Sequence, residues 1–317
     1  MSSLTSHVWK ARKLSLASLL LLIPMLILSA CGADSGSTTT QDKGSITIGG
    51  KKDAEAELFT ELYTLILEHK GFKVNSKLAF GNTPQNFAAI KSGDIDLYAE
   101  FTGTALNILN LNSTYDPQKD YDAIKQQYKD QYKITWLDRA ADLNDGYALC
   151  INKNDPQTQG ITTISELASK VSQFQLETAS DGTSFVDGLK KTYNFDSNSF
   201  KKTETVDYSV ALTSVGSKQA QVAVCYGTDT GVDAQGLKFL QDDKNGFPAF
   251  NPSPIIRDEV LKKYPEIADD LNPLAKVLTT DVSISLQKQL VEKQKSESQR
   301  QALKDVATDF LKSKGLL

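Results

Sequence analysis

Segments with the pattern of strands alternate with segments with the pattern of helices along most of this chain, and this alternation restricts the possible folds more than any other feature. Residues 45–50 alternate in polarity like a strand and end at a glycine pair, and apolar side chains at helical spacing follow in residues 58–66. Residues 72–80 and 94–100 repeat the strand pattern, with another helical segment between them. Such alternation predicts an α/β fold with a mostly parallel, doubly wound sheet.

A second series of the same kind begins after Leu143. Strand patterns recur at residues 147–152, 174–178, 222–226 and 237–240, and helical segments separate most of them. The 317 residues of the chain are enough for two domains of ordinary size. The sequence therefore predicts two sheet domains rather than one large sheet.

The last part of the chain helps to assign the boundaries of these two lobes. Residues from Pro254 onward carry helical patterns only, so they are expected to pack on the first lobe rather than to form a third domain. The first lobe is predicted to contain residues 45–140 and 247–317, and the second lobe residues 146–241. The chain then crosses between the lobes twice, which predicts a two-segment hinge beside a ligand cleft.

The amino-terminal segment has the pattern of a secretory signal peptide. Basic residues at 10–13 precede an uncharged apolar run at 14–30. The run ends in Leu-Ser-Ala-Cys, which resembles a bacterial lipobox, so Cys31 is predicted to be lipidated and to begin the mature chain. Residues 1–30 would be the signal peptide and residues 31–44 a flexible polar tether. An uncleaved membrane anchor is the alternative, and both place the rest of the chain outside the cytoplasm.

Charge and missing motifs exclude several classes of function. The chain has 35 lysines and arginines against 39 aspartates and glutamates, a formal net charge of −4, which argues against nucleic acid as a partner. His69 is the only histidine beyond the signal peptide, so no Ser-His-Asp or Cys-His catalytic set can be assembled. The sequence also lacks a zinc-binding cluster, a glycine-rich phosphate loop and a dinucleotide-binding fingerprint. We therefore expect a protein that is not an enzyme and that needs no metal or other cofactor.

Two cysteines remain once Cys31 is assigned to the anchor. Cys150 and Cys225 each lie within a short apolar segment. This context favours two buried, small apolar side chains over a disulfide bond, and it does not exclude the bond.

Candidate ligand-binding residues lie near the predicted strand ends. In open α/β sheets ligands bind beyond the carboxyl ends of the strands. The segments expected at this edge are residues 50–55, 101–104, 145–147 and 226–229. Residues 247–250 lie at the second crossing and are expected to face the same cleft.

The same segments carry a resemblance to a known family. An acidic strand leads into Glu-Phe-Thr-Gly-Thr at residues 100–104, and Asp-Gly-Tyr, Tyr-Gly-Thr-Asp and Phe-Pro-Ala-Phe follow at 145–147, 226–229 and 247–250. In this order they resemble the extracytoplasmic substrate-binding lipoproteins of ABC importers for glycine betaine, choline, carnitine and related quaternary ammonium osmoprotectants. The resemblance implies a two-lobed, type II-like periplasmic-binding-protein fold. It also implies a monomer that delivers a small quaternary ammonium ligand to a membrane permease.

The resemblance also assigns site residues. In the family, aromatic side chains box the trimethylammonium head of the ligand, because the negative faces of the rings attract a cation that has no N–H to donate. The positions that match this aromatic cage are Phe101, Tyr147, Tyr226 and Phe250. The polar end of the ligand is matched by Lys51, Thr104 and Asp145.

One feature of the family is missing from this chain. The family binds the ligand's carboxylate with an arginine of the second lobe, but no arginine occurs between Arg139 and Arg257. Depending on where a gap is placed when this chain is aligned with the family, the position of that arginine falls near Asp181 or at Phe185. Either Lys51 holds the carboxylate, or the ligand lacks one, as choline does. A binding protein for another cation or an amino acid, and a ligand-sensing lipoprotein of the same fold, remain the alternatives.

Overall fold

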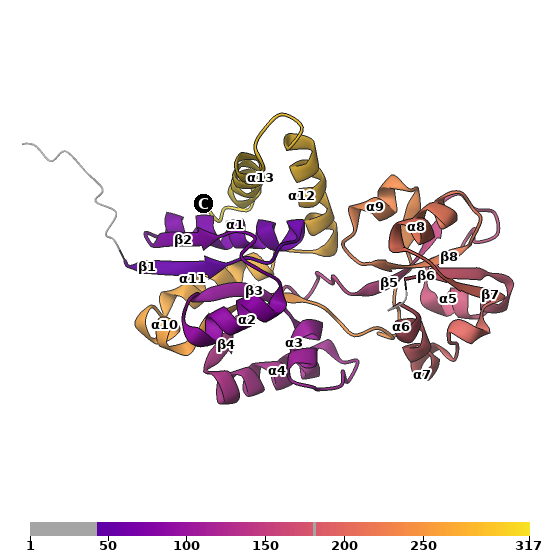
Figure 1. Cartoon of the computed structure of the whole chain (residues 1–317), viewed down its shortest axis with the longest axis horizontal. Helices are drawn as coiled ribbons and strands as arrows, with labels where there is room; N and C mark the ends of the chain where they lie inside the picture. Colours follow the sequence, from indigo (N-terminus) through magenta and orange to yellow (C-terminus); the bar gives the residue numbers. More distant parts are fainter. Residues whose placement is uncertain (1–42, 180–181) are drawn as a thin grey trace, which may run out of the picture. The chain divides into compact units, whose positions relative to one another are not determined.

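The computed structural model describes residues 43–179 and 182–317. The predicted signal peptide, the lipidation site at Cys31 and nearly all of the tether lie outside the described residues. Two five-stranded sheets organise the described part of the chain (Figure 1). Within that part, no helix combines the length and the apolar character that a membrane span requires.

The sheet of the first lobe is mixed, with strand order β2-β1-β3-β10-β4. Strand β1 (Ser45–Gly49) lies parallel to β2 (Lys73–Lys77) and to β3 (Leu97–Phe101). Strand β10 (Pro252–Arg257) is antiparallel to β3 on one side and to β4 (Ile134–Trp136) on the other.

The sheet of the second lobe repeats this design, with strand order β7-β6-β8-β5-β9. Strand β6 is parallel to β7 and β8, whereas β5 is antiparallel to β8 and β9. The strands are β5 (Tyr147–Asn152), β6 (Gln175–Thr178), β7 (Lys202–Thr205), β8 (Val222–Tyr226) and β9 (Leu237–Phe239).

Helices cover both faces of the first sheet. Helix α1 is buried along nearly its whole length between the sheet and the carboxyl-terminal helices, and Asp53 caps its first turn by accepting from the Ala56 amide. A second apolar cluster around Tyr98, Tyr128 and Trp136 fills the opposite face. The helices of this lobe are α1 (Ala54–His69), α2 (Thr83–Ser92), α3 (Thr102–Ile108), α4 (Pro117–Tyr132), α10 (Asp258–Lys263), α11 (Glu266–Ala275), α12 (Thr280–Lys293) and α13 (Gln299–Ser313).

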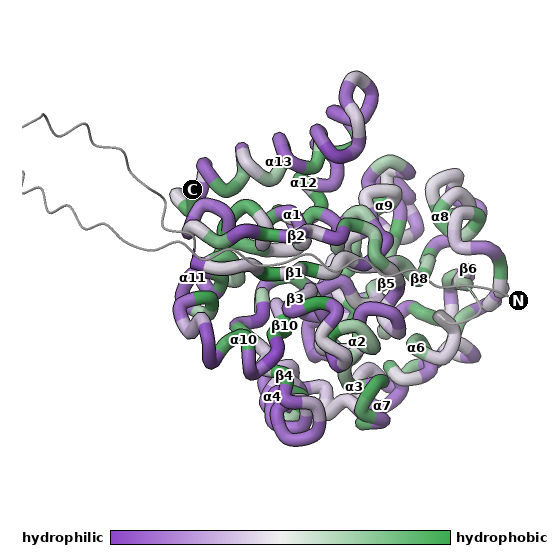
Figure 2. The backbone as a smooth tube through the Cα atoms, turned by 60° about the vertical axis from the view of Figure 1, so that its left-hand side comes forward, coloured by the Kyte–Doolittle hydropathy of each residue, from purple (hydrophilic) through white to green (hydrophobic). Residues whose placement is uncertain are grey.

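The second lobe has shorter helices and also a separate apolar cluster on each face of its sheet. Apolar residues recur along the strands and on one side of the long helices, as amphipathic packing requires (Figure 2). The helices are α5 (Ile164–Ala168), α6 (Gly182–Gly188), α7 (Lys190–Tyr193), α8 (Tyr208–Gly216) and α9 (Thr230–Ala234), with 3-10 turns at Val171–Gln173 and Ser197–Ser199.

The expectation that residues from Pro254 onward contain no strand was wrong. Strand β10 occupies an interior position of the first sheet, where Ile255 and Ile256 are fully buried. Pro252 and Pro254 lack an amide N–H, and prolines normally argue against an interior strand. For this reason the sequence pattern did not predict β10. The strands β4 and β7 were also not expected, because three or four residues are too few to show a period.

The expectation of two separate cysteines was also wrong, because Cys150 and Cys225 form a disulfide. Strands β5 and β8 are antiparallel neighbours, with Cys150 opposite Ala223 and Ala148 opposite Cys225. The two cysteines are therefore diagonal neighbours on one face, with their Cα atoms 6.1 Å apart, within the span of a disulfide. The apolar context of each cysteine contains no information about this register.

Candidate functional site

The mixed sheets bring the predicted site segments together at the strand ends. Strands β5 and β10 each follow a crossing between the lobes, the first crossing directly before Tyr147 and the second directly before Pro252. Each of the two strands enters its sheet antiparallel to a central strand. The start of β5 at Tyr147 therefore lies opposite the end of β8 at Tyr226. In the same way, Pro252 at the start of β10 lies opposite Phe101 at the end of β3.

Aromatic rings of the second lobe form a continuous cluster. The ring centroids of Tyr147 and Tyr226 lie 5.4 Å apart, and Tyr208 lies 4.9 Å from Tyr226. The ring of Phe185 stacks on that of Tyr147, with centroids 3.6 Å apart and planes 21° from parallel. Tyr208 was not among the predicted site residues, because it lies in a helix and its approach to Tyr226 depends on how that helix packs.

The other two predicted cage residues lie on the first lobe and on the second crossing. Phe101 is buried at the end of β3, with its ring centroid 6.2 Å from that of Phe59. Phe250 packs directly on Gly103, where a Cβ would lie 2.5 Å from Cε2 and Cζ of the phenylalanine ring. The Phe250 amide donates to Asn144 Oδ1 over 2.8 Å. The ring contact holds the second crossing against the start of α3, and the hydrogen bond ties it to the first crossing.

The lysine expected to hold a carboxylate already has a protein partner. Lys51 Nζ lies 2.5 Å from Glu100 Oε1, and both side chains are buried. The Tyr98 hydroxyl donates to the other Glu100 oxygen over 2.8 Å. Lys51 Nζ also lies 4.8 Å from the centroid of the Phe101 ring, and Thr104 is half-buried in the first turn of α3. The positive charge at Lys51 is thus neutralised within the protein.

A pair of carboxyl groups lies where the first crossing meets α1. The Asp145 carboxyl accepts from the Thr228 hydroxyl, and the Glu55 carboxyl accepts from the Ser283 hydroxyl. Burial raises the pKa of Asp145 to about 6. Burial, and then the nearby charge of Asp145, raise the pKa of Glu55 well above its ordinary value. Burial and the charge of Asp145 therefore both disfavour the ionised form of Glu55.

Glu55 was missed as an individual site residue, although it lies within the predicted segment 50–55. Its partner Ser283 comes from α12, more than 200 positions away in the chain. Gln287 of the same helix donates to the Thr228 carbonyl over 3.2 Å, so α12 contacts the turn after β8. Within the described residues, no group of three or more His, Cys, Asp or Glu side chains is placed to hold a metal ion.

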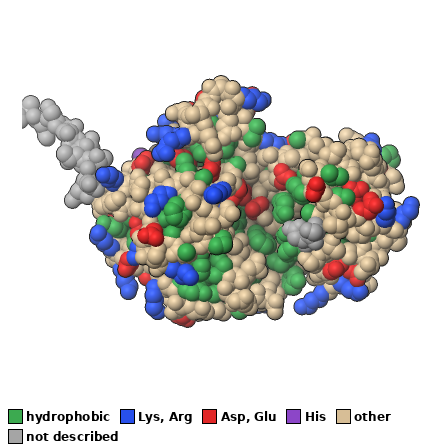
Figure 3. Space-filling view, in the orientation of Figure 1, with side chains coloured by type: hydrophobic (Ala, Val, Ile, Leu, Met, Phe, Trp, Pro, Cys, Tyr) green, Lys and Arg blue, Asp and Glu red, His purple; other side chains and the backbone are tan. Residues whose placement is uncertain are grey.

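A cavity of about 430 Å³ lies between elements of both lobes. The space-filling view shows apolar side chains gathered in the hollow between the two lobes (Figure 3). Phe250 is the predicted cage residue that lines the cavity. Its described lining residues are Gly103, Leu106, Asn107, Leu111, Asn112, Ser113, Tyr115, Phe185, Lys191, Pro248 and Phe250.

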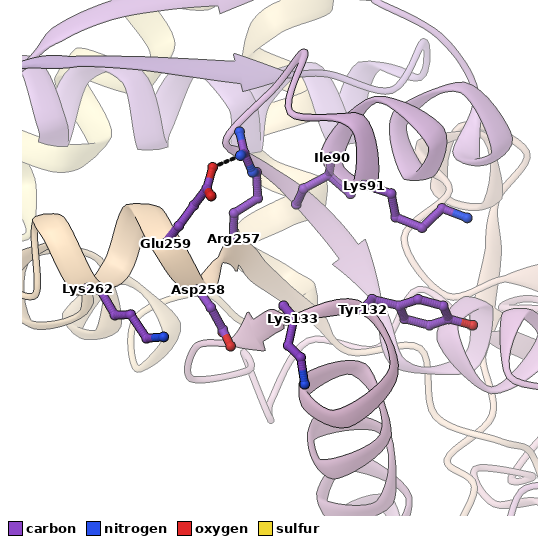
Figure 4. Close-up of a pocket in the computed structure, with 8 residues that line it drawn as sticks. All are labelled: Ile90, Lys91, Tyr132, Lys133, Arg257, Asp258, Glu259 and Lys262. Atoms are coloured by element: carbon purple, nitrogen blue, oxygen red, sulfur yellow. Dashed lines mark ion pairs between the residues drawn. The ribbon is translucent and has the colours of Figure 1, made fainter.

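Another cavity, of about 290 Å³, lies on the first lobe beside Tyr132, and no predicted site residue lines it (Figure 4). Arg257 lines this cavity, and its guanidinium group is already paired with Glu259 and lies 3.3 Å from Asp96 Oδ1. Its central cation is therefore committed to internal ion pairs, and it is the weaker candidate for a ligand site.

Comparison with known proteins decides the family. Residues 44–313 match the model of the substrate-binding domain of ABC-type glycine betaine transport systems. The chain belongs to this family. It is 29% identical over 282 residues to the carnitine transport binding protein OpuCC of Listeria monocytogenes, with 86% of this chain and 89% of that protein covered. It is 26% identical over 294 residues to the glycine betaine-binding protein YehZ of Escherichia coli, with 88% and 93% covered.

The fold of the solved relatives agrees with that of this substrate-binding protein. The structure of apo YehZ aligns with a TM-score of 0.73 at 25% identity, over 86% of this chain and 99% of that one. The family consists of extracytoplasmic substrate-binding proteins that work with a membrane permease. The predicted family, the two-lobed fold and the non-enzymatic function are therefore confirmed.

Proposed function

We propose that this substrate-binding protein captures a small quaternary ammonium solute between its lobes in an aromatic cage and delivers it to an ABC permease. The observation that carries the proposal is that aromatic side chains of both sheets lie at the strand ends beside the two crossings. Tyr147 and Tyr226 are opposite one another at the edge of the second sheet, and Phe101 ends the central strand of the first. Phe250 comes from the second crossing and reaches the cavity. Rings in such an arrangement suit a cation that sheds its water easily.

The polar groups of the site favour a ligand without a carboxylate. Lys51 is neutralised by Glu100, and the pair Asp145 and Glu55 adds negative charge nearby. A ligand carboxylate would be repelled by this pair, and it would find no guanidinium in the second lobe. A hydroxyl group, as in choline, donates a hydrogen bond to a carboxylate instead. We therefore propose that the ligand is choline, or a similar quaternary ammonium compound without a carboxylate, rather than glycine betaine.

Calorimetric titration of choline, glycine betaine and carnitine into the protein tests both the binding of a quaternary amine and the preference for choline. We expect choline to bind at least as tightly as glycine betaine. A preference for glycine betaine of about a hundredfold, or 2.7 kcal/mol, would contradict the ligand choice. In that case Lys191, the described cation that lines the cavity, is the next group to test by Lys191→Gln. If none of the quaternary amines binds, the proposed function is wrong.

Substitutions at Tyr226 separate a cage wall from a core residue. Tyr226→Ala should weaken choline binding by about five- to thirtyfold, because one ring face and its exclusion of water are lost. Tyr226→Phe keeps the ring and should cost much less. The control is the melting temperature without ligand, which a residue of the core would lower by itself. An alanine variant that melts early but binds choline as before would contradict the cage.

Membrane attachment and oligomeric state belong to the same proposal. We expect the mature chain to start at a lipidated Cys31, to be held at the outer face of the membrane through a tether of residues 31–44, and to act as a monomer. We also propose that residues 45–140 with 247–317 form one lobe and residues 146–241 the other, and the division of the strands between two sheets supports this.

A sensing role is the second candidate function. It is favoured by 26% identity over 245 residues to the chemotactic signal transduction system substrate-binding protein CosB of Halobacterium salinarum, with 68% of this chain and 70% of that protein covered. The neighbouring genes distinguish the two roles. Genes for a permease and an ATPase support import, whereas a gene for a transducer or a sensor kinase supports signalling.

A further inference from the structure

Phe185 stacks closely on one of the predicted cage residues. It lies in α6, is half-buried, and places its ring centroid 3.6 Å from that of Tyr147 with the planes nearly parallel. Two rings at this distance are in van der Waals contact, so no ligand group fits between them. The face of Tyr147 that Phe185 covers is therefore closed to a ligand while this stack persists.

Phe185 also lines the cavity between the lobes, together with Gly103, Lys191 and Phe250. The described lining residues of this cavity include Phe185 but not Tyr147. Phe185 thus stands between the cavity and Tyr147. With Phe250 and Tyr115, it is one of the three described aromatic side chains that a ligand in this cavity would meet.

The rings behind Phe185 support it. Tyr147 lies 5.4 Å from Tyr226, which lies 4.9 Å from Tyr208. The Tyr208 hydroxyl donates to the Asp229 carboxylate, which anchors the far end of this series. A ring that is backed by packed aromatic neighbours keeps its orientation, as a wall of a binding site must.

From this arrangement we infer that Phe185 is a specificity-determining wall of the ligand cavity and that it selects cations whose remaining groups carry no negative charge. The inference rests on the proposed function and names a residue outside the predicted cage. A phenyl face attracts an ammonium group and offers no donor to a carboxylate.

Calorimetric titration with choline and with glycine betaine tests this on the wild-type protein and its variants. Phe185→Leu should weaken choline binding by at least about fivefold, because leucine has no ring face, and Phe185→Trp should restore it to within about threefold. Phe185→Arg should shift the ratio of affinities toward glycine betaine by at least about tenfold, because a guanidinium then faces the cavity. This shift is not expected from a residue whose role is only structural.

Phe87→Leu is the matched control. Phe87 is also half-buried on a helix and packs against a tyrosine, Tyr132, with ring centroids 5.1 Å apart, but it lies on the first lobe away from the cavity. Its substitution should leave both affinities unchanged.

Three results would overturn the inference while the proposed function stands. These are choline binding by Phe185→Leu within about twofold of wild type, an unchanged ratio of affinities in Phe185→Arg, and a Phe185→Trp fluorescence spectrum that does not respond to saturating choline. The last measurement needs only a folded aromatic variant, so it applies even if leucine at this position destabilises the lobe. A wild-type protein that binds no quaternary amine would overturn the proposed function and this inference together.

Discussion

Replacing Asp145 by asparagine should stabilise the protein at neutral pH and have little effect in acid. In the folded protein burial raises the pKa of Asp145 from its ordinary value of 3.8 to about 6. Each pKa unit corresponds to about 1.4 kcal/mol, so the ionised Asp145 costs about 3 kcal/mol of folding free energy. Its partner Glu55, whose pKa burial and Asp145 also raise, acts in the same direction.

The direction of this pH dependence follows from the number of protons that the folded and unfolded states bind. Between about pH 4 and pH 6 the folded protein keeps a proton on Asp145 that the unfolded chain has already lost, so the free energy of unfolding falls as the pH rises through this window. Asparagine at position 145 does not titrate, and its amide can still bond to Thr228 and Glu55. The difference in unfolding free energy between Asp145→Asn and the wild type should therefore grow by about 2.5 kcal/mol from pH 4 to pH 7.

Urea titration followed by circular dichroism at several pH values measures this difference. The control is Asp233→Asn. Lys153 and then Lys288 lower the pKa of Asp233 to about 2. This exposed carboxylate therefore stabilises the folded protein at pH values above its ordinary pKa, and the stabilisation is lost as the pH falls. The control should therefore show a small dependence of opposite sign. A constant difference for Asp145→Asn across the pH range, or a variant less stable than wild type at pH 7, would refute the reasoning about the carboxyl pair.

Three further predictions concern other parts of the molecule. Replacing Cys150 and Cys225 by alanine should lower the unfolding free energy by about 4.5 kcal/mol, because the bond closes a loop of 75 residues, and a urea titration with no loss would contradict the pairing. Lys51→Met should leave Glu100 buried without its partner and destabilise the protein by about 3–5 kcal/mol in the same assay. Lys51→Met combined with Glu100→Gln, which removes both charges, should not alter the ratio of choline to glycine betaine affinity. A selective loss of glycine betaine in this double variant would show that Lys51 holds the carboxylate. Cys31→Ser should release the protein from the membrane fraction or leave the signal peptide uncleaved, and a mature terminus elsewhere without an acyl mass in mass spectrometry would exclude the anchor.

The sequence by itself determined the alternation of strands and helices and the family. Periodic burial acts over a few neighbouring residues, so the pattern at residues 45–50 or 147–152 is visible without knowledge of the rest of the fold. The positions of the site segments also followed from the sequence, because ligands of such sheets bind at the strand ends. Phe101, Tyr147, Tyr226 and Phe250 could be placed at this edge for that reason, whereas their roles came from the resemblance.

Only the tertiary structure decided which residues meet across the chain. The pairing of Cys150 with Cys225 depends on the register of two strands 75 residues apart, and that of Lys51 with Glu100 on two strand ends 49 residues apart. Strand β10 exists because β3 and β4 leave a place between them that Ile255 and Ile256 can fill, despite two prolines. The stack of Phe185 on Tyr147 depends on how α6 packs beside β5. Local patterns carry no information about such contacts, because their free energy arises only when distant segments exclude water together.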